Sequence, residues 1–268
     1  MTRAVENVIA LPTMSQKVGK PQRWIVLPDT HLPYEDKATL RAVESYMADH
    51  KWDGWIQLGD LIDFNEISHF EEGNRRLDKV GAIRKSYEAT AAFLDRHRSI
   101  VGRSCKMVYI EGNHEDRITR YLEKNPEGVG LLEVPNALRL KERRIEWVPF
   151  WSKGRLFRVG NAYFCHGRAT NKNHTATMLD KYGVCLYMGH LHDVQLTSKA
   201  RWGDNKTLEA GSLGCLCRYD QTYLKGNPTN WQQAFGVFHF FPDGFYQHYT
   251  VRIFKSRFVS PEGKVYGG

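Results

Sequence analysis

The chain has 268 residues, of which 41% are hydrophobic and 25% are charged, and this balance excludes a disordered or fibrous protein. No apolar run approaches the roughly 20 residues that a membrane-spanning helix needs, so we expect a cytoplasmic protein with no membrane partner. The formal net charge of +8 favours an anionic partner such as nucleic acid, although a basic surface alone does not decide the function.

The cysteines and the first 20 residues indicate the redox compartment of the protein and where its folded domain begins. Five cysteines are an odd number and form no CxxC pair, so a thiolate zinc site is not expected and a reducing compartment is the default. Residues 1–20 carry only a short apolar piece, broken by Pro12, and no cleavage signature. We expect them to form a mobile arm or a first strand, followed by one domain over residues 21–268.

Short apolar runs alternate with helical patterns in the first half of the chain. The patterns predict strands at 23–29, 54–60 and 105–113, and helices at 36–50 and 78–98. Asp36 is placed to cap the first helix. Strands that alternate with helices in this way predict parallel βαβ units.

Beyond residue 140 the patterns become mostly strand-like, with one helix expected near 173–182. The prediction for the whole chain is an α/β fold in which two mixed sheets pack together and helices flank them. Two longer segments, near 64–80 and 214–232, are expected to be insertions that shape a substrate site.

Metal-competent side chains follow five of the apolar runs. They lie in the blocks "DTH" (29–31), "GDLID" (59–63), "GNHE" (112–115), "CHG" (165–167) and "GHLH" (189–192). Each block alone is commonly a turn, a helix cap or a loop. Together, at the carboxyl ends of strands where open α/β sheets place their sites, they predict one converged constellation.

The residue types suit a pair of metal ions. Carboxylate oxygens and neutral imidazoles fit Mn²⁺, Fe or Zn²⁺, and one carboxylate can bridge two ions about 3.5–4 Å apart. Two divalent ions bring a charge of +4, which Asp29 and Asp60 offset only in part. The remaining field would hold a phosphate and lower the pKa of a bridging water, and the hydroxide formed would be a nucleophile at neutral pH.

This ordered set resembles the calcineurin-like metallophosphoesterases, in a bacterial or phage-type form, whose pattern is D-x-H … G-D-x-x-D … G-N-H-[DE] … H … G-H-x-H. All five blocks are present, in order, between residues 29 and 192. The resemblance implies a four-layer α/β/β/α sandwich and a centre of two divalent ions. Mn²⁺ is the favoured ion for activity, with Fe, Zn²⁺ or Ni²⁺ as alternatives.

The resemblance also implies a role for each residue of the motifs. The first metal would be held by Asp29, His31 and His192, the second by Asn113, His166 and His190, and both by a bridging Asp60. His114 would approach the phosphate, oriented by Asp63. A neighbouring carboxylate favours the imidazolium form of His114, which could then protonate the leaving group.

The substrate class is less sharply indicated. In the protein phosphatases that the chain resembles, an arginine follows the second block and grips phosphate, whereas Phe64 stands at that place here. We therefore expect a phosphodiesterase acting on DNA, RNA or a nucleotide. A phosphomonoesterase acting on a phosphoprotein is the alternative, and a catalytically inactive scaffold is the least favoured because all seven ligand positions are filled.

Several residues outside the motifs are candidates for contact with the substrate. They are His69, Arg75, Arg76, Arg168, His174, Tyr219 and Trp231. The aromatic rings of Tyr219 and Trp231 could stack on a base. Histidines in such segments are more often surface residues than substrate contacts, and this is the alternative for His69 and His174.

Overall fold

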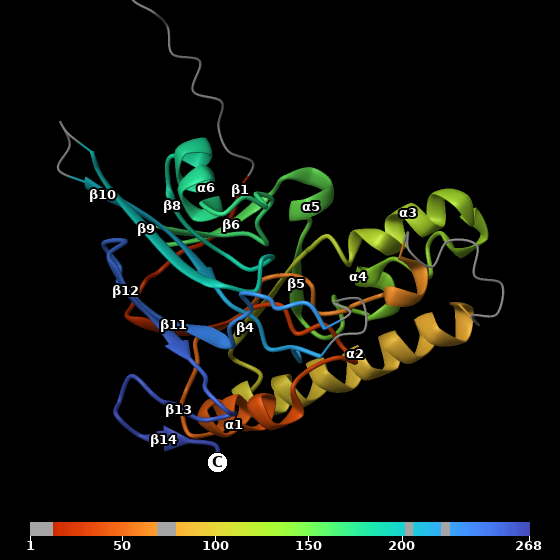
Figure 1. Cartoon of the computed structure of the whole chain (residues 1–268), viewed down its shortest axis with the longest axis horizontal. Helices are drawn as coiled ribbons and strands as arrows, with labels where there is room; N and C mark the ends of the chain where they lie inside the picture. Colours follow the sequence, from red (N-terminus) through yellow and green to blue (C-terminus); the bar gives the residue numbers. More distant parts are fainter. Residues whose placement is uncertain (1–12, 69–78, 202–205, 221–225) are drawn as a thin grey trace, which may run out of the picture.

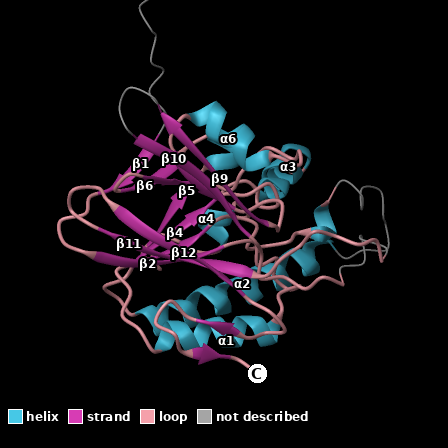
Figure 2. Cartoon of the chain, turned by 60° about the vertical axis from the view of Figure 1, so that its left-hand side comes forward, coloured by secondary structure: helices cyan, strands magenta, loops and turns pink. Residues whose placement is uncertain are grey.

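The computed structural model describes residues 13–68, 79–201, 206–220 and 226–268 (Figure 1). Within these ranges the chain forms two six-stranded mixed sheets and a small two-stranded ribbon. Helices cover the outer faces, with α1 and α2 on one side of the strands and α6 on the other (Figure 2). The expected pair of packed, helix-flanked sheets is confirmed.

The first sheet has the strand order β12-β11-β2-β3-β4-β5. Its strands are β2 (Gln22–Leu27), β3 (Gly54–Gln57), β4 (Lys106–Ile110), β5 (Ile145–Val148), β11 (Ala234–Phe240) and β12 (Tyr246–Arg252). Strands β2 to β5 pair in parallel, and β11 and β12 pair antiparallel at the other side. The predicted parallel βαβ units are therefore present.

The second sheet has the order β1-β6-β7-β8-β10-β9. Its strands are β1 (Thr13–Gln16), β6 (Leu156–Val159), β7 (Ala162–Phe164), β8 (Cys185–Met188), β9 (Val194–Arg201) and β10 (Lys206–Leu213). Strand β1 pairs in parallel with β6, so residues 13–16 of the expected N-terminal arm form an edge strand. Residues 1–12 lie outside the described residues.

The principal helices are α1 (Lys37–Ala48), α2 (Lys79–Val101), α3 (Asp116–Lys124), α4 (Val134–Ala137), α5 (Phe150–Lys153) and α6 (His174–Tyr182). Shorter elements are the 3₁₀ turns Asn65–Ile67 and Pro126–Gly128 and the ribbon β13 (Phe258–Val259) and β14 (Val265–Tyr266). None of the described helices has the length and apolar content needed to cross a bilayer.

The expectation of a single helix after residue 140 is wrong, because α5 follows β5 directly. Helix α5 has four residues, too few for a hydrophobic period to show in the sequence. It begins after Pro149 and ends at Gly154, whose φ of 66° lies in the left-handed region that closes helices.

Two hydrophobic layers hold the sheets in place. Trp24 and Val26 of β2 point between the two sheets, whereas Ile25 and Leu27 point toward α1 and α2. This alternation follows from the two-residue period of a strand, and it makes β2 apolar throughout because both of its faces are covered. Burial on both faces fixes the strand register, and with it the position of the strand ends where the predicted site lies.

Candidate metal centre

The motif residues that follow different strands meet at one edge of the sandwich. Four groups of neighbouring side chains have ligand atoms that all lie within 4.8 Å of one another. They are Asp29–His31–His192, His31–Asp60–His114, Asp60–His166–His190 and His192–Cys215–Cys217. The first three groups share members, so the strand ends build one continuous buried constellation.

The first cluster contains Asp29, His31 and His192. The Nε2 atoms of the two histidines are 3.0 Å apart. Asp29 Oδ1 lies 3.3 Å from His192 Nε2 and 3.9 Å from His31 Nε2. All three residues are buried. Three potential ligand atoms thus face one small volume beside β2.

The second cluster is built around the amide oxygen of Asn113. This oxygen lies 2.9 Å from His166 Nε2 and 2.9 Å from His190 Nδ1, and the two ring nitrogens are 3.2 Å apart. Asp60 Oδ2 lies 3.2 Å from His166 Nε2 and also 3.7 Å from His31 Nε2 of the first cluster. The carboxylate of Asp60 therefore faces both clusters.

Contacts on the outer side of three histidines direct their Nε2 atoms inward. His166 Nδ1 lies 2.9 Å from the carbonyl oxygen of Leu58, which can only accept, so Nδ1 donates there and Nε2 is the nitrogen left to face the cluster. His31 Nδ1 is held in the same way, 2.9 Å from the carboxylate of Asp63. Such outer contacts commonly fix the tautomer of metal-binding histidines.

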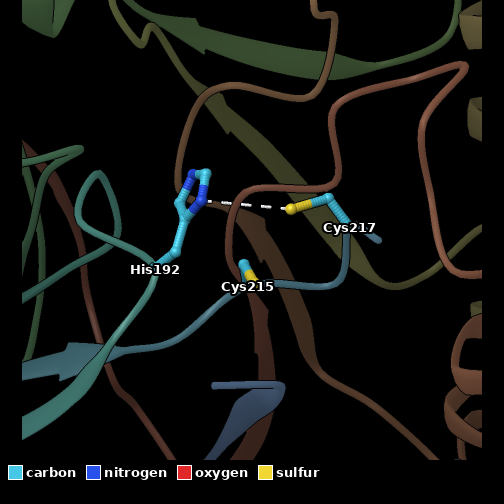
Figure 3. A group of neighbouring side chains, drawn as sticks. All are labelled: His192, Cys215 and Cys217. Atoms are coloured by element: carbon cyan, nitrogen blue, oxygen red, sulfur yellow. Dashed lines mark hydrogen bonds between the residues drawn. The ribbon is translucent and has the colours of Figure 1, made fainter. Parts of the chain in front are cut away.

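The third outer contact comes from a thiol. Cys217 Sγ lies 4.0 Å from His192 Nδ1, and Figure 3 shows this sulfur directed at the outer edge of the imidazole. Cys215 and Cys217 are free and buried. Since Nε2 of the same ring faces Asp29, the thiol lies behind His192 with respect to the first cluster.

The donor set fits divalent cations. Neutral imidazoles whose lone pairs face one another repel unless a proton or a cation lies between them. His190 Nε2 is buried and has no hydrogen-bond partner among the described residues, although its Nδ1 faces Asn113. A set of nitrogen and oxygen donors without a thiolate is typical of Mn²⁺, Fe or Zn²⁺ sites.

The charges within the constellation are strongly coupled. Burial acts to raise the pKa of Asp60, but His114, His166 and His31 bring it well below its usual range. Burial acts to lower the pKa of His166, and the Asp60 carboxylate outweighs this and raises it to about 9. The carboxylates are therefore anionic and hold positive charge beside them, as a cation site requires.

The backbone at the centre is strained. His31, Asp60, His190 and His192 have φ values of 52°, 49°, 79° and 61°, in the left-handed region that non-glycine residues rarely adopt. Strain of this kind costs on the order of 1–3 kcal/mol per residue and concentrates at functional sites. Four of the seven predicted ligands therefore occupy backbone conformations that the surrounding fold imposes.

Two motif glycines let the carboxylates approach the main chain. A Cβ at Gly112 would lie 2.2 Å from Asp60 Oδ1, and one at Gly189 would lie 1.9 Å from Asp29 Oδ2. Any side chain at either position would displace a predicted ligand. The glycines of "GNHE" and "GHLH" thus serve close packing against the aspartates.

The contacts of His114 differ in part from the prediction. The residue that orients it is Asp63, but through the main-chain carbonyl oxygen, which lies 2.7 Å from His114 Nδ1, whereas the Asp63 carboxylate is 3.5 Å away. The expected imidazolium is wrong for this structure. Burial lowers the pKa of His114 to about 3, against the opposing effect of Asp60. Nδ1 therefore carries the proton and Nε2 a lone pair.

Glu115, the last residue of the third block, has a structural role that the sequence did not indicate. Its carboxylate accepts hydrogen bonds from the backbone N–H groups of Asp60, Leu61, Ile62 and Gly112 and from the Tyr109 hydroxyl. One buried side chain thereby joins the second and third motif blocks.

The structure describes some of the candidate substrate residues and not others. His69, Arg75 and Arg76 lie outside the described residues. Arg168 donates to the carbonyl oxygens of Phe150 and Trp151, and its guanidinium lies over both rings at 5.2 and 5.0 Å.

Two further candidates have partners inside the protein. His174 is buried, with Nε2 3.2 Å from Asp193 Oδ1, so the expectation of a surface histidine is wrong. The Tyr219 hydroxyl accepts from the N–H of Gln233 at 2.7 Å, and its ring stays 47% exposed.

Two partly exposed tryptophans stand beside the centre. The Trp231 ring lies 4.3 Å from that of His192, and the Trp151 ring lies 5.5 Å from that of His190 and 6.1 Å from that of His166. Trp151 belongs to α5 and was not among the predicted substrate residues. Its proximity depends on the β5–α5 turn, and the four residues of α5 are too few to show a hydrophobic period in the sequence.

Comparisons with known proteins give distant relatives. No protein-family model matches the chain. The Gene 54 protein of Mycobacterium phage L5 is 25% identical over 233 residues, which cover 81% of this chain and 88% of that protein. The Gene 54 protein of Mycobacterium phage D29 is 25% identical over 240 residues, with the same coverage.

Among solved structures, Vps29 from Entamoeba histolytica, crystallised with Zn²⁺, aligns with a TM-score of 0.43 and 12% identity over 91% of this chain and 95% of that one. Vps29 from Chaetomium thermophilum aligns with a TM-score of 0.45 and 11% identity over 91% and 94% of the two chains. On its own geometry, the chain has the two-sheet sandwich of the calcineurin-like metallophosphoesterases and clusters their motif residues in its interior.

Proposed function

We propose that this protein is a dinuclear metal-dependent phosphodiesterase that acts on nucleic acid or nucleotides. The observation that carries the proposal is the position of Asp60, whose Oδ2 atom lies 3.2 Å from His166 Nε2 and 3.7 Å from His31 Nε2. A carboxylate shared between two donor clusters is what a pair of ions about 3.5–4 Å apart requires.

The proposed ligands divide between two positions. Asp29, His31 and His192 would hold one ion, Asn113, His166 and His190 the other, and Asp60 both. Divalent ions bound there would supply Lewis-acid charge and a hydroxide nucleophile at neutral pH, and we propose Mn²⁺ as the activating ion. His114, whose Nε2 lies 3.8 Å from Asp60 Oδ2 and accepts from Arg117, would stand beside the phosphate at the rim of the site.

The two tryptophans support an aromatic, nucleotide-type substrate. Trp151 stands beside the histidines of one proposed ion position and Trp231 beside His192 of the other. A phosphodiester between two nucleosides has a base on each side of the phosphate, and each stacked base contributes about 1–3 kcal/mol. The net charge of +8 agrees with an anionic polymer as substrate.

A substrate panel tests the proposal. We expect the Mn²⁺-loaded protein to hydrolyse bis-p-nitrophenyl phosphate and DNA or RNA with a kcat/KM at least tenfold above that for p-nitrophenyl phosphate. Parallel assays with Ni²⁺, Mg²⁺ and Zn²⁺ rank the ions. A reversed preference would replace the proposal by a phosphomonoesterase, and no turnover on any ester with two ions bound would leave a non-catalytic metal-binding scaffold.

Base stacking is tested by Trp151→Ala. We expect KM for an oligonucleotide to rise about tenfold or more, while KM for methyl p-nitrophenyl phosphate, which has no base, changes little. Phe245→Ala is the control, because Phe245 is 57% exposed and precedes β12, away from the motif blocks. Equal effects of Trp151→Ala on the two substrates would argue against stacking.

A further inference from the structure

Arg117 is a cationic side chain beside the phosphate-facing atom of the site. It lies in the first turn of α3, three residues after His114. Its Nη2 atom is 3.0 Å from His114 Nε2. Because Nδ1 of that ring carries the proton, Nε2 accepts and Arg117 donates. The guanidinium is therefore aligned with the ring nitrogen that faces the proposed substrate.

A single carbonyl oxygen anchors both side chains. The main-chain oxygen of Asp63 accepts from Arg117 Nη1 at 2.8 Å and lies 2.7 Å from His114 Nδ1. The guanidinium and the imidazole are thus fixed relative to each other before any ligand arrives. Preorganised donors of this kind stabilise charge without a cost of reorganisation at the moment of reaction.

The charge of Arg117 is only partly balanced within the protein. The nearest Asp63 carboxylate oxygen lies 3.9 Å from Nη1, beyond hydrogen-bond distance, and the other oxygen bonds His31 at 2.9 Å. The Arg117 side chain remains 18% exposed, so a ligand can reach it. The planar array of N–H donors of a guanidinium matches the spacing of two oxygens of a phosphate.

The neighbouring motif position supplies no competing cation. Phe64 directly follows the second block, with φ at 50° and no exposed surface. Its ring packs against Tyr87, 5.3 Å away in the core beneath α2. The side chain at this position therefore faces the core.

We infer that Arg117 binds a non-bridging oxygen of the substrate phosphate, a role that rests on the proposed phosphodiesterase function. It is a catalytic residue in this assignment, since the guanidinium touches the phosphate on which charge develops. In the free protein the Arg117 guanidinium donates to His114 Nε2. The phosphate would draw the guanidinium into a second, charge-assisted contact.

Arg117→Met tests this assignment because it keeps an unbranched, flexible side chain and removes the guanidinium with its charge. In the Mn²⁺-loaded protein we expect kcat/KM for bis-p-nitrophenyl phosphate to fall about 10²–10³-fold, as for loss of one preorganised donor. Inorganic phosphate, titrated by calorimetry without turnover, should bind at least tenfold more weakly. Arg117→Lys should recover part of the phosphate affinity.

Two controls separate this role from a structural one. Arg120→Met removes an exposed arginine of the same helix that pairs with Asp116 at 3.1 Å, and it should leave both readouts unchanged. Metal content of Arg117→Met should equal that of the unaltered protein, which shows that the centre is intact.

The outcomes distinguish this inference from the proposed function. Loss of turnover with unchanged phosphate affinity would overturn the inference and leave Arg117 as a residue that positions His114. Unchanged turnover and affinity would also overturn it, while hydrolysis by the unaltered protein would leave the proposed function standing. Failure of the unaltered protein to hydrolyse any diester counts against the proposed function, and phosphate affinity then still reports on Arg117.

Discussion

His31 and His192, 161 residues apart in the sequence, meet with their Nε2 atoms 3.0 Å apart. Each ring is held from behind, His31 by the Asp63 carboxylate at 2.9 Å and His192 by the Cys217 sulfur at 4.0 Å. Two imidazoles oriented to present the same atom to one point can serve as a pair of metal ligands. A cation bound at that point would satisfy both lone pairs, so metal binding should depend on the residues that surround it.

Asp60→Asn should reduce metal binding from two ions per chain to one or none. The substitution preserves the shape of the side chain but turns one oxygen that faces both clusters into an amide donor and removes a negative charge. Inductively coupled plasma mass spectrometry after gel filtration measures the stoichiometry. Asp95→Asn is the matched control, because Asp95 is 60% exposed and pairs with Arg143, and both residues lie outside the five motif blocks. Two ions retained by Asp60→Asn would contradict the bridging role.

Removal of metal should lower the melting temperature. The centre buries the charges of Asp29 and Asp60 among imidazoles, and a bound cation would bring these donors together. Ions present at about 100 times their Kd stabilise the folded state by about 2.7 kcal/mol, which corresponds to a shift of about 5–10 °C for a chain of this size. Differential scanning fluorimetry with EDTA and after Mn²⁺ is restored measures the shift. The same treatment should change Asp60→Asn less, and identical melting curves with and without EDTA would contradict a resident metal.

Asp36→Ala should destabilise the fold by about 1–2 kcal/mol through loss of the cap of α1. Asp36 Oδ1 accepts from the N–H groups of Ala38 and Thr39 at 3.1 and 3.0 Å, and Oδ2 accepts from Gln233 Nε2 at 3.0 Å. Urea denaturation at pH 7 measures the loss. Asp36→Asn retains one acceptor and should lose less, so an equal loss in both variants would argue against the cap.

The contribution of Asp36 should also depend on pH. Burial acts to raise its pKa, but the Thr39 and Gln233 hydrogen bonds lower it below the ordinary 3.8. A carboxyl whose pKa is depressed by folding stabilises the protein above its unfolded pKa, and that stability is lost as the pH falls through the folded value. The difference between the unaltered protein and Asp36→Ala should therefore shrink below about pH 4. A difference that stays constant down to pH 3 would contradict this.

Local patterns predicted the elements that depend on local chemistry. The β2-α1-β3-α2-β4 alternation, the Asp36 cap and the five motif blocks are all legible because hydrophobic period and capping residues act within a few positions. The convergence of the blocks at one edge followed from the parallel topology. What the sequence could not predict depends on contacts between distant segments.

Three features illustrate that limit. Strand β1 is defined by its pairing with β6, more than 100 residues away, and nothing within its four residues requires it. The main-chain carbonyl of Asp63 orients His114. Every residue has such a carbonyl, so the sequence does not predict which one accepts a given hydrogen bond. Trp151 reaches the site only because α5 turns directly out of β5.

Glu115→Gln should destabilise the fold more than Asp36→Ala does, by about 2–4 kcal/mol. Four backbone N–H groups and one hydroxyl converge on the Glu115 carboxylate, which is 1% exposed. An amide at this place must turn its NH₂ group toward at least one of these donors, which leaves a buried donor without an acceptor. Because this carboxylate anchors the N–H groups of Asp60 and Leu61, metal affinity should weaken as well. Urea denaturation and Mn²⁺ titration measure the two effects. Glu88→Gln, at an exposed position of α2 where the side chain is 68% exposed, is the matched control and should change neither. A Glu115→Gln protein as stable as this control would show that the carboxylate does not hold the second and third blocks together.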